Sequence, residues 1–110
     1  MKDDRLYLIY ISECIGRIEN YTSGGMDSFL SSSMVQDAVL RNLHTLAEST
    51  QRLSERLRRQ HNEIDWRAIS GFRNLIVHDY LGVDFMFCWK IIEKDIPMLK
   101  KAITEMLENN

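Results

Sequence analysis

Apolar residues recur at steps of three and four along most of the chain, which is the spacing that places one buried face on an α-helix. In the first stretch these positions are Leu6, Tyr7, Tyr10, Ile11, Cys14, Ile15, Ile18 and Tyr21. The last stretch repeats in alternating steps of four and three, like the seam of a helical bundle. The pattern predicts four long helices, at about residues 3–21, 34–60, 66 to 77 or 78, and 85–106.

Capping residues and helix breakers divide this pattern. Side chains suited to cap the start of a helix are Asp3 or Asp4, Asp27, Ser31 to Ser33, Asp65 and Asp84. Asp27 would begin a short helical turn over residues 26–30. The run Thr22–Gly25 is expected to end the first helix and Gly82 the third. Pro97 lies inside the fourth, where we expect a kink or a broken turn.

Length and composition favour one helical domain. The chain has 110 residues, which predicts a single domain over residues 1–110. Five Gly and one Pro are few for a β fold with many turns. We therefore expect an all-α fold, an up-down bundle of four to five helices. Because so small a domain has much surface for its volume, it gains stability from pairing, and we expect a homodimer.

The sequence also narrows the partners and cofactors. The net charge of -2 gives no strong general attraction to nucleic acid. No apolar run approaches the ~20 residues of a membrane span, and the N-terminus lacks a signal core, so we expect a cytoplasmic protein. Cys14 and Cys88 lack metal-ligand spacing and are expected to be reduced thiols in the core. His44, His61 and His78 are too widely spaced for a zinc centre, so we expect no metal and no cofactor.

The stretch of residues 72–80 carries the densest chemistry of the chain. It brings together a cation, an amide, an imidazole, a carboxylate and a phenol, from Arg73, Asn74, His78, Asp79 and Tyr80. On a straight helix, Arg73 and His78 would diverge by about 140°. Either the helix ends before His78 and the chain turns back, or two chains meet at a two-fold axis and share one cleft. Gly71, just upstream, would let another backbone approach closely.

These groups suit cleavage of an RNA phosphodiester without a metal ion. A neutral imidazole can accept the proton of the ribose 2′-OH and an imidazolium can protonate the leaving 5′-oxygen, because the reference pKa of His is about 6.5. Arg73 offers a permanent fork of donors for phosphate oxygens. Asn74, Asp79 and Tyr80 would support the pair. Since one His cannot be acid and base in the same step, this chemistry also favours a dimer.

Other interpretations of the same residues stay open. An Arg and a His near a helix end often form only a surface pair or a cap, in a helical adaptor without activity. Arg52, Arg56 and Arg59 form a basic end on the second predicted helix, either a solvated helix face or a contact for the RNA backbone. His44 and His61 are expected to be solvated, without a role.

The motif Arg73-x4-His78-x-Tyr80 resembles that of the HepT family of HEPN-domain toxins. The similarity extends to the opening DDRLYLIYISECIGRIENY, the central WRAISGFRNLIVHDYLGVD and the closing WKIIEKDIPMLKKAI. The resemblance implies a helical bundle that dimerises through the motif helices. It also implies a metal-independent ribonuclease, with Arg73 and His78 as the catalytic pair and Asn74 as their polar neighbour.

The resemblance further implies a type VII toxin-antitoxin system. The partner would be a minimal nucleotidyltransferase antitoxin of the MntA type, which transfers AMP from ATP to the motif tyrosine, here Tyr80. A bulky anion two residues from His78 would block the cleft and repel RNA. The alternative is a non-catalytic subunit that binds a nucleotidyltransferase and its nucleotide substrate, with Arg73 and His78 holding phosphates.

Overall fold

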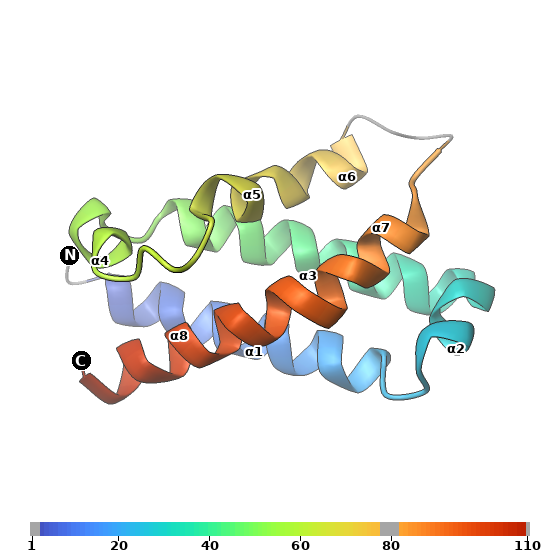
Figure 1. Ribbon diagram of the computed structural model, residues 1–110, viewed down its shortest axis with the longest axis horizontal. Helices are drawn as coiled ribbons and strands as arrows, with labels where there is room; N and C mark the ends of the chain where they lie inside the picture. Colours follow the sequence, from blue (N-terminus) through green and yellow to red (C-terminus); the bar gives the residue numbers. More distant parts are fainter. Residues whose placement is uncertain (1–2, 78–81, 110) are drawn as a thin grey trace.

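The computed structural model describes residues 3–77 and 82–109, and every regular element within them is helical (Figure 1). The elements are α1 (Asp4–Tyr21), α2 (Met26–Ser31), α3 (Ser33–Gln51), α4 (Glu55–Arg59), α5 (Trp66–Ser70), the 3-10 turn η1 (Gly71–Arg73), α6 (Asn74–Val77), α7 (Phe85–Lys90), the π-helical segment η2 (Ile91–Asp95) and α8 (Ile96–Asn109). The prediction of an all-α fold is confirmed.

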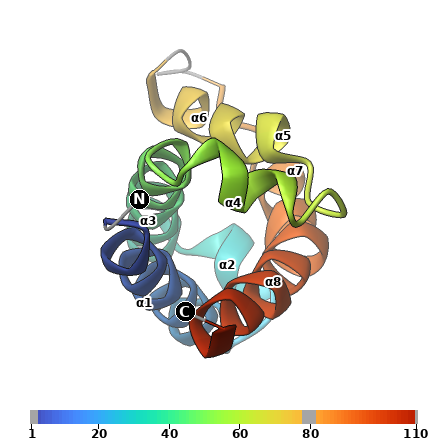
Figure 2. The same cartoon turned by 90° about the vertical axis from the view of Figure 1, so that its left-hand side faces the viewer.

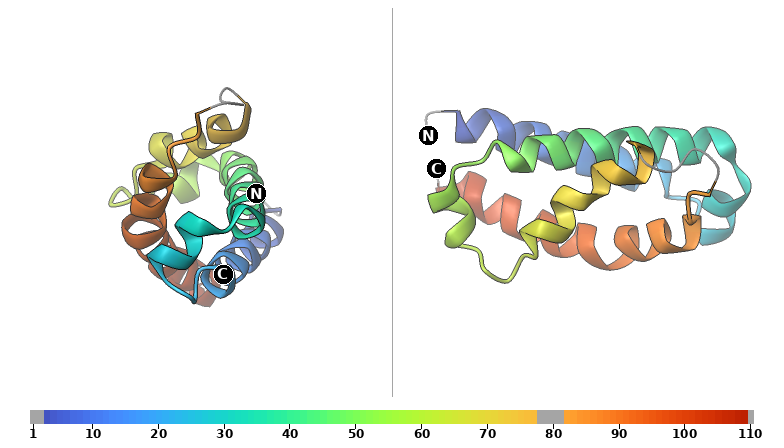
Figure 3. Two further views of the ribbon diagram at one scale, coloured as in Figure 1. Left: turned by 90° about the vertical axis from the view of Figure 1, so that its right-hand side faces the viewer. Right: turned by 90° about the horizontal axis from the view of Figure 1, so that it is seen from above.

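The elements form four rods that run alternately up and down the molecule. α1 packs against α3 along its length and against α8 on its other side. The third rod is the short run from α5 to α6, which lies across α3, and α2 packs against α3 and α7 at one end. Seen end-on, the rods surround a shared interior (Figure 2). From above, the run from α5 to α6 crosses toward the middle of α3 (Figure 3). The up-down bundle is therefore confirmed.

The core is the space between these rods. Its largest fully buried side chains are Phe29, Leu8, Ile11, Ile15, Ile18, Leu43, Leu46, Ile96, Leu99, Ile103, Met106 and Val39. One predicted face was partly wrong, because Leu6 and Tyr10 are 45% and 44% exposed. The buried stripe of α1 starts at Leu8, since only this face meets α3 and α8 at once.

The second predicted helix was too long. It breaks after Gln51, and a new helix, α4, starts behind Ser54. The Ser54 Oγ accepts a hydrogen bond from the Leu57 N–H at 3.2 Å, which caps α4. The Asp4 carboxylate accepts two further bonds, from the Ser54 N–H at 2.8 Å and its hydroxyl at 2.7 Å. These hydrogen bonds therefore connect the start of α1 to the turn between α3 and α4.

The third and fourth predicted helices are interrupted as well. The third contains the 3-10 turn η1 between α5 and α6, and its predicted end lies partly outside the described residues. The fourth contains the π-helical segment η2, directly before α8. Pro97 lacks the N–H that would bond to the carbonyl of Glu93 and its ring crowds that carbonyl, which accounts for the irregular turn. The expected kink or broken turn at Pro97 takes this form.

Most of the predicted caps hold. The N-caps Ser32, Asp65 and Asp84 each accept a hydrogen bond from the backbone N–H three residues on. Asp27 was wrong, because α2 begins one residue earlier behind Gly25, whose φ of 91° suits only a residue without Cβ. Asp3 occupies the N-cap position of α1, but its side chain makes no cap bond.

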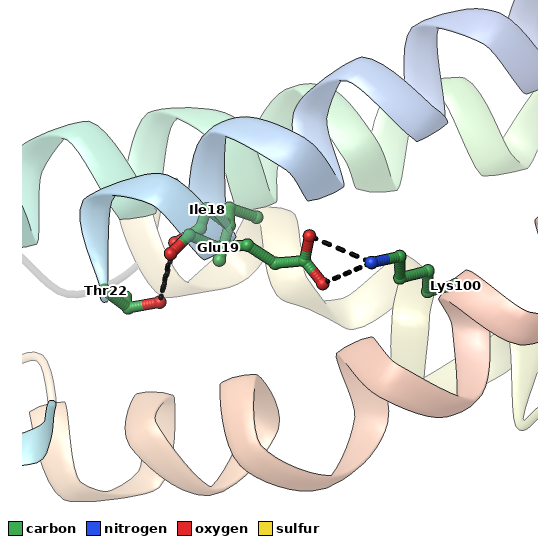
Figure 4. A network of polar contacts seen from close by, with 4 residues as sticks. All are labelled: Ile18, Glu19, Thr22 and Lys100. Carbon is green, nitrogen blue, oxygen red and sulfur yellow. Dashed lines mark hydrogen bonds and ion pairs between the residues drawn. The ribbon is translucent and has the colours of Figure 1, made fainter.

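The end of α1 is held from two sides (Figure 4). The Thr22 hydroxyl donates to the carbonyl of Ile18 at 2.7 Å, within the last turn of the helix. One turn earlier, Lys100 Nζ of α8 lies 3.2 and 3.0 Å from the two carboxylate oxygens of Glu19. Both side chains are about half exposed, so this pair adds at most about 1 kcal/mol to stability. It links α1 to α8 near the end of α1.

Two further findings concern the cysteines and the hydrophobicity of the helices. Cys14 and Cys88 are both buried free thiols, as expected. Within residues 3–77 and 82–109, no helix has the length and hydrophobicity needed to cross a membrane.

Candidate functional site

Arg73 ends the 3-10 turn η1, at the point where the chain enters α6. Phe72 beside it is 4% exposed and packs into the core, and this packing holds the backbone of the turn in place. The Arg73 side chain itself is 43% exposed. The guanidinium therefore lies at the surface, above a fixed backbone, and solvent can reach it.

Two side chains of α3 hold the guanidinium of Arg73. Its Nη1 donates to Glu48 Oε2 at 3.2 Å and to Gln51 Oε1 at 3.3 Å. A guanidinium carries five N–H donors in a rigid fork, and both contacts use the same nitrogen. In general, a guanidinium can bind a pair of phosphate oxygens through its fork of donors, and the contacts with Glu48 and Gln51 restrict the orientation of this one. Sequence reasoning missed both residues, because they lie 25 and 22 positions upstream.

The other motif residues are placed only in part. Asn74 is the first residue of α6 and is exposed, directly after Arg73. His78, Asp79 and Tyr80 lie outside the described residues. Their convergence on Arg73, and a cleft shared by two chains, therefore stay predictions. Apart from the neighbouring backbone, no heavy atom of the described residues lies within 4 Å of where a Cβ of residue 71 would stand, so Gly71 is open on its side-chain face in this part of the chain.

The three predicted RNA-contacting arginines do not share one helix. Arg52 follows the end of α3, whereas Arg56 and Arg59 lie on α4 beyond the break. All three are exposed. Arg59 Nη2 pairs with Glu55 Oε2 at 3.1 Å, and both side chains are 73% exposed. The predicted basic end is thus a turn with mixed charge, and its contact with RNA stays a prediction.

A surface pocket of about 570 Å³ opens on α3, on the stretch that precedes Glu48. The described residues that line it are Asp37, Leu40, Arg41, His44 and Thr45. Among the described residues, His44 Nδ1 is buried and has no hydrogen-bond partner. The expectation of a solvated His44 was therefore wrong: the ring is half-buried, with one nitrogen turned away from water. The spacing of His44 in the sequence gives no signal of this burial, which only the packing of the bundle decides.

His61 is not solvated either. Its Nδ1 lies 3.2 Å from Glu63 Oε2, and its side chain is 16% exposed. Glu105 of α8 lies beside this pair. His61, Glu63 and Glu105 each offer one atom that could bind a metal ion, and these three atoms lie within 4.8 Å of one another. A backbone hydrogen bond and the contact with His61 lower the pKa of Glu63. No side chain of this group contacts Arg73 in the part of the chain that the structure describes.

Comparisons with known proteins found a matching family model and several relatives. The family model for ribonuclease HepT-like proteins matches residues 11–106. The chain is 36% identical over 108 residues to "Gamma-glutamylcyclotransferase and putative RNase MJ0434" of Methanocaldococcus jannaschii, which covers 97% of this chain and 49% of that protein. It is 32% identical over 109 residues to "Putative RNase TTE0752" of Caldanaerobacter subterraneus subsp. tengcongensis, covering 98% and 97%.

A third relative is "Probable ribonuclease HepT" of Thermococcus cleftensis. It is 37% identical over 95 residues, which cover 86% of this chain and 86% of that protein. The chain thus spans about half the length of the first relative and nearly all of the second. No solved structure matches the chain at a significant level.

Proposed function

The chain belongs to the HepT-like ribonuclease family, and from this premise we propose that it is a metal-independent endoribonuclease toxin. The observation that carries the proposal is the guanidinium of Arg73, which is fixed by α3 and yet open to solvent. A group meant to bind a phosphate needs both properties, because it must be oriented before the substrate arrives and accessible when it does. Asn74 follows it directly in the chain and is exposed.

The proposed reaction is an internal transesterification in RNA. A neutral His78 imidazole takes the proton of the ribose 2′-OH, whose oxygen attacks phosphorus. The bond from phosphorus to the 5′-oxygen breaks, and that oxygen takes a proton from a second imidazole, in its charged form. A 2′,3′-cyclic phosphate and a free 5′-OH result. Arg73 offsets the negative charge that builds on the phosphate oxygens in between.

The second imidazole comes from a second copy of the chain. A two-fold axis beside α6 would bring two Arg73 and two His78 side chains to one cleft. The open backbone face at Gly71 supports this, because another chain could pack there without meeting a side chain. Asp79 would then orient the imidazole as a neighbouring carboxylate.

We propose further that the toxin is silenced chemically, as part of a type VII system. An antitoxin of the minimal nucleotidyltransferase class would transfer AMP from ATP to the Tyr80 hydroxyl, releasing pyrophosphate. The added phosphate carries negative charge next to Arg73 and His78 and would compete with RNA for them. Mass spectrometry of Tyr80 after incubation with ATP and such an enzyme tests this step.

The activity is tested with the purified chain in EDTA and a labelled RNA oligonucleotide. Native protein is expected to cut the RNA and to leave 2′,3′-cyclic phosphate ends. Arg73→Ala and His78→Ala should each reduce the rate at least a hundredfold while circular dichroism and the melting temperature stay near those of the native chain. Retained cleavage in His78→Ala would refute the mechanism.

One observation favours the non-catalytic alternative. Glu48 places a carboxylate 3.2 Å from the Arg73 guanidinium, which is what a purely structural ion pair would also show. In that case the chain would be a subunit that docks a nucleotidyltransferase and helps to hold its nucleotide. Induced expression without a partner separates the two: growth arrest with degraded RNA in native but not His78→Ala cells supports the nuclease, and normal growth supports the binding subunit.

A further inference from the structure

The pocket on α3 has the size and chemistry of a small-molecule site. Its volume of about 570 Å³ falls in the range of pockets that hold nucleotide-sized ligands. Leu40 is 8% exposed and supplies an apolar floor. Asp37 supplies acceptors, Arg41 supplies donors, and the imidazole of His44 can do either. These groups match a flat ring with a polar edge.

His44 lines the pocket and also carries an unsatisfied ring nitrogen. Its Nδ1 is buried and finds no partner among the described residues. A buried polar atom without a hydrogen bond is destabilising, and folded proteins rarely keep one without a reason. Because Nδ1 is turned away from water, a ligand in the pocket would reach it only after a turn of the imidazole about its Cβ–Cγ bond, and a donor or an acceptor on the ligand would then satisfy this nitrogen.

The pocket and the two side chains that hold Arg73, Glu48 and Gln51, share one face of α3. On an ideal helix Asp37, Arg41, His44, Glu48 and Gln51 fall within about 80° of one another around the axis. His44 precedes Glu48 by four residues, or about 6 Å of helix rise. Since Glu48 and Gln51 hold Arg73, the pocket lies within reach of any strand whose phosphate is bound there. A base attached near that phosphate could turn into the pocket.

The charges of the pocket favour a base over a phosphate. Asp37 and Arg41 lie about one turn apart on α3, so the described lining carries one formal charge of each sign besides His44. A bare phosphate would gain from Arg41 but be repelled by Asp37. The edge of a nucleobase presents donors and acceptors side by side, and single-stranded RNA is recognised through such edges.

We propose that this pocket binds one RNA base adjacent to the phosphate at Arg73, and that His44 reads its edge. The proposal rests on the proposed ribonuclease function and deepens it: His44 and Asp37 would determine at which bases the RNA is cut. His44 takes no part in the chemical step. It would set the sequence preference of cleavage and leave the cyclic phosphate product unchanged.

The first test measures binding without any cleavage. The four nucleoside 5′-monophosphates are titrated into the full chain, and the imidazole signals of His44 and His61 are followed by NMR. The signals are assigned with His44→Ala and His61→Ala. The proposal expects His44 signals to shift with some bases at concentrations about tenfold lower than with others, as one lost hydrogen bond dictates, while His61 stays still. Equal responses to all four bases, or none, would overturn it.

The second test maps cut sites on a long RNA of mixed sequence. His44→Ala should reduce the preference among flanking bases about tenfold, whereas His44→Gln, which keeps an edge of hydrogen-bonding atoms, should change the preferred base or keep part of it. His61→Ala is the control and should leave the pattern as in the native chain. An unchanged pattern in His44→Ala refutes the proposal. His44 signals that depend on protein concentration instead of nucleotide would show that a second copy covers the pocket, which also refutes it.

The two tests keep this proposal separate from the ribonuclease function. If the native chain cuts no RNA, or if His78→Ala still cuts, the nuclease mechanism fails and the titration alone decides the pocket. If cleavage depends on His78 but the preferred cut sites do not change in His44→Ala, the ribonuclease mechanism is supported and the proposed base-binding pocket is refuted.

Discussion

Glu48 offers the sharpest test of how the bundle positions Arg73. Replacing it by Ala removes the carboxylate that lies 3.2 Å from the Arg73 guanidinium and leaves Gln51 as the remaining contact from α3. Replacing it by Gln keeps a hydrogen-bond acceptor and removes the charge. The two variants separate the orientation of the guanidinium from the charge beside it.

The effect on stability is expected to be small. The two side chains are 43% and 39% exposed, so water screens the pair and its net contribution is at most about 1 kcal/mol. For a domain of this size that lowers the melting temperature by no more than about 4–8 °C. The effect on catalysis should be larger, since a guanidinium that is free to rotate spends little time in the productive geometry; we expect kcat to fall tenfold to a hundredfold in Glu48→Ala.

The substrate affinity should change in the opposite direction. Loss of the carboxylate makes the surface around Arg73 more positive, so RNA should bind more tightly and KM should fall, with a steeper dependence on salt. Glu48→Gln should show the same lower KM with a smaller loss of kcat. A merely structural role would lower activity only in proportion to the fraction unfolded, and would leave KM in place.

The assay is steady-state cleavage of a fluorescent RNA at several salt concentrations, beside thermal melts of each variant. Glu55→Ala is the matched control, because Glu55 also pairs with an arginine, Arg59, at 3.1 Å but far more exposed. It should change neither kcat nor the melting temperature measurably. A native kcat in Glu48→Ala, or an equal loss in Glu55→Ala, would refute the positioning role.

Three further predictions concern stability and reactivity. Burial alone would raise the pKa of Asp4, but the hydrogen bonds from Ser54 outweigh it and lower that pKa below 3.8. The resulting stability is present above the unfolded pKa and lost as pH falls through the folded one. Asp4→Asn should therefore cost about 1 kcal/mol in urea melts at pH 7 and progressively less as the pH is lowered below 4; equal losses across this range would contradict this. Burial raises the pKa of the Cys88 thiol to about 11, so a thiol reagent at pH 8 should react only as the chain unfolds, and rapid labelling of the native state would count against it. Lys100→Ala should cost under about 1 kcal/mol, and the loss should shrink in 1 M salt, because the pair with Glu19 is half exposed.

Most of the helices could be predicted from local patterns of capping and apolar residues. Helix starts at Ser32, Asp65 and Asp84 follow from side chains that bond their own backbone three residues on, so they are readable in the sequence. The interruption of the second helix at residues 52–54 was not readable, because its cause includes a partner 50 residues away, the Asp4 carboxylate that binds Ser54. An apolar repeat cannot show where a distant side chain stops a helix.

The candidate site divides in the same way. Arg73 and its motif stand together in the sequence, and their chemical types alone suggest phosphate chemistry. The groups that surround Arg73 come from α3, a different rod of the bundle, and only the crossing of α5 to α6 over that helix decides that Glu48 and Gln51 are its neighbours. His44 shows the same limit, since its spacing gives no sign that one nitrogen is buried without a partner.

The sequence by itself therefore determined the helical class, most of the helix starts and the candidate motif, because each depends on residues within a few positions of one another. The tertiary structure decided which motif group is held, by which side chains, and what pocket lies beside it. Those depend on contacts between segments more than 20 residues apart, which form only when the rods pack and which no local spacing encodes.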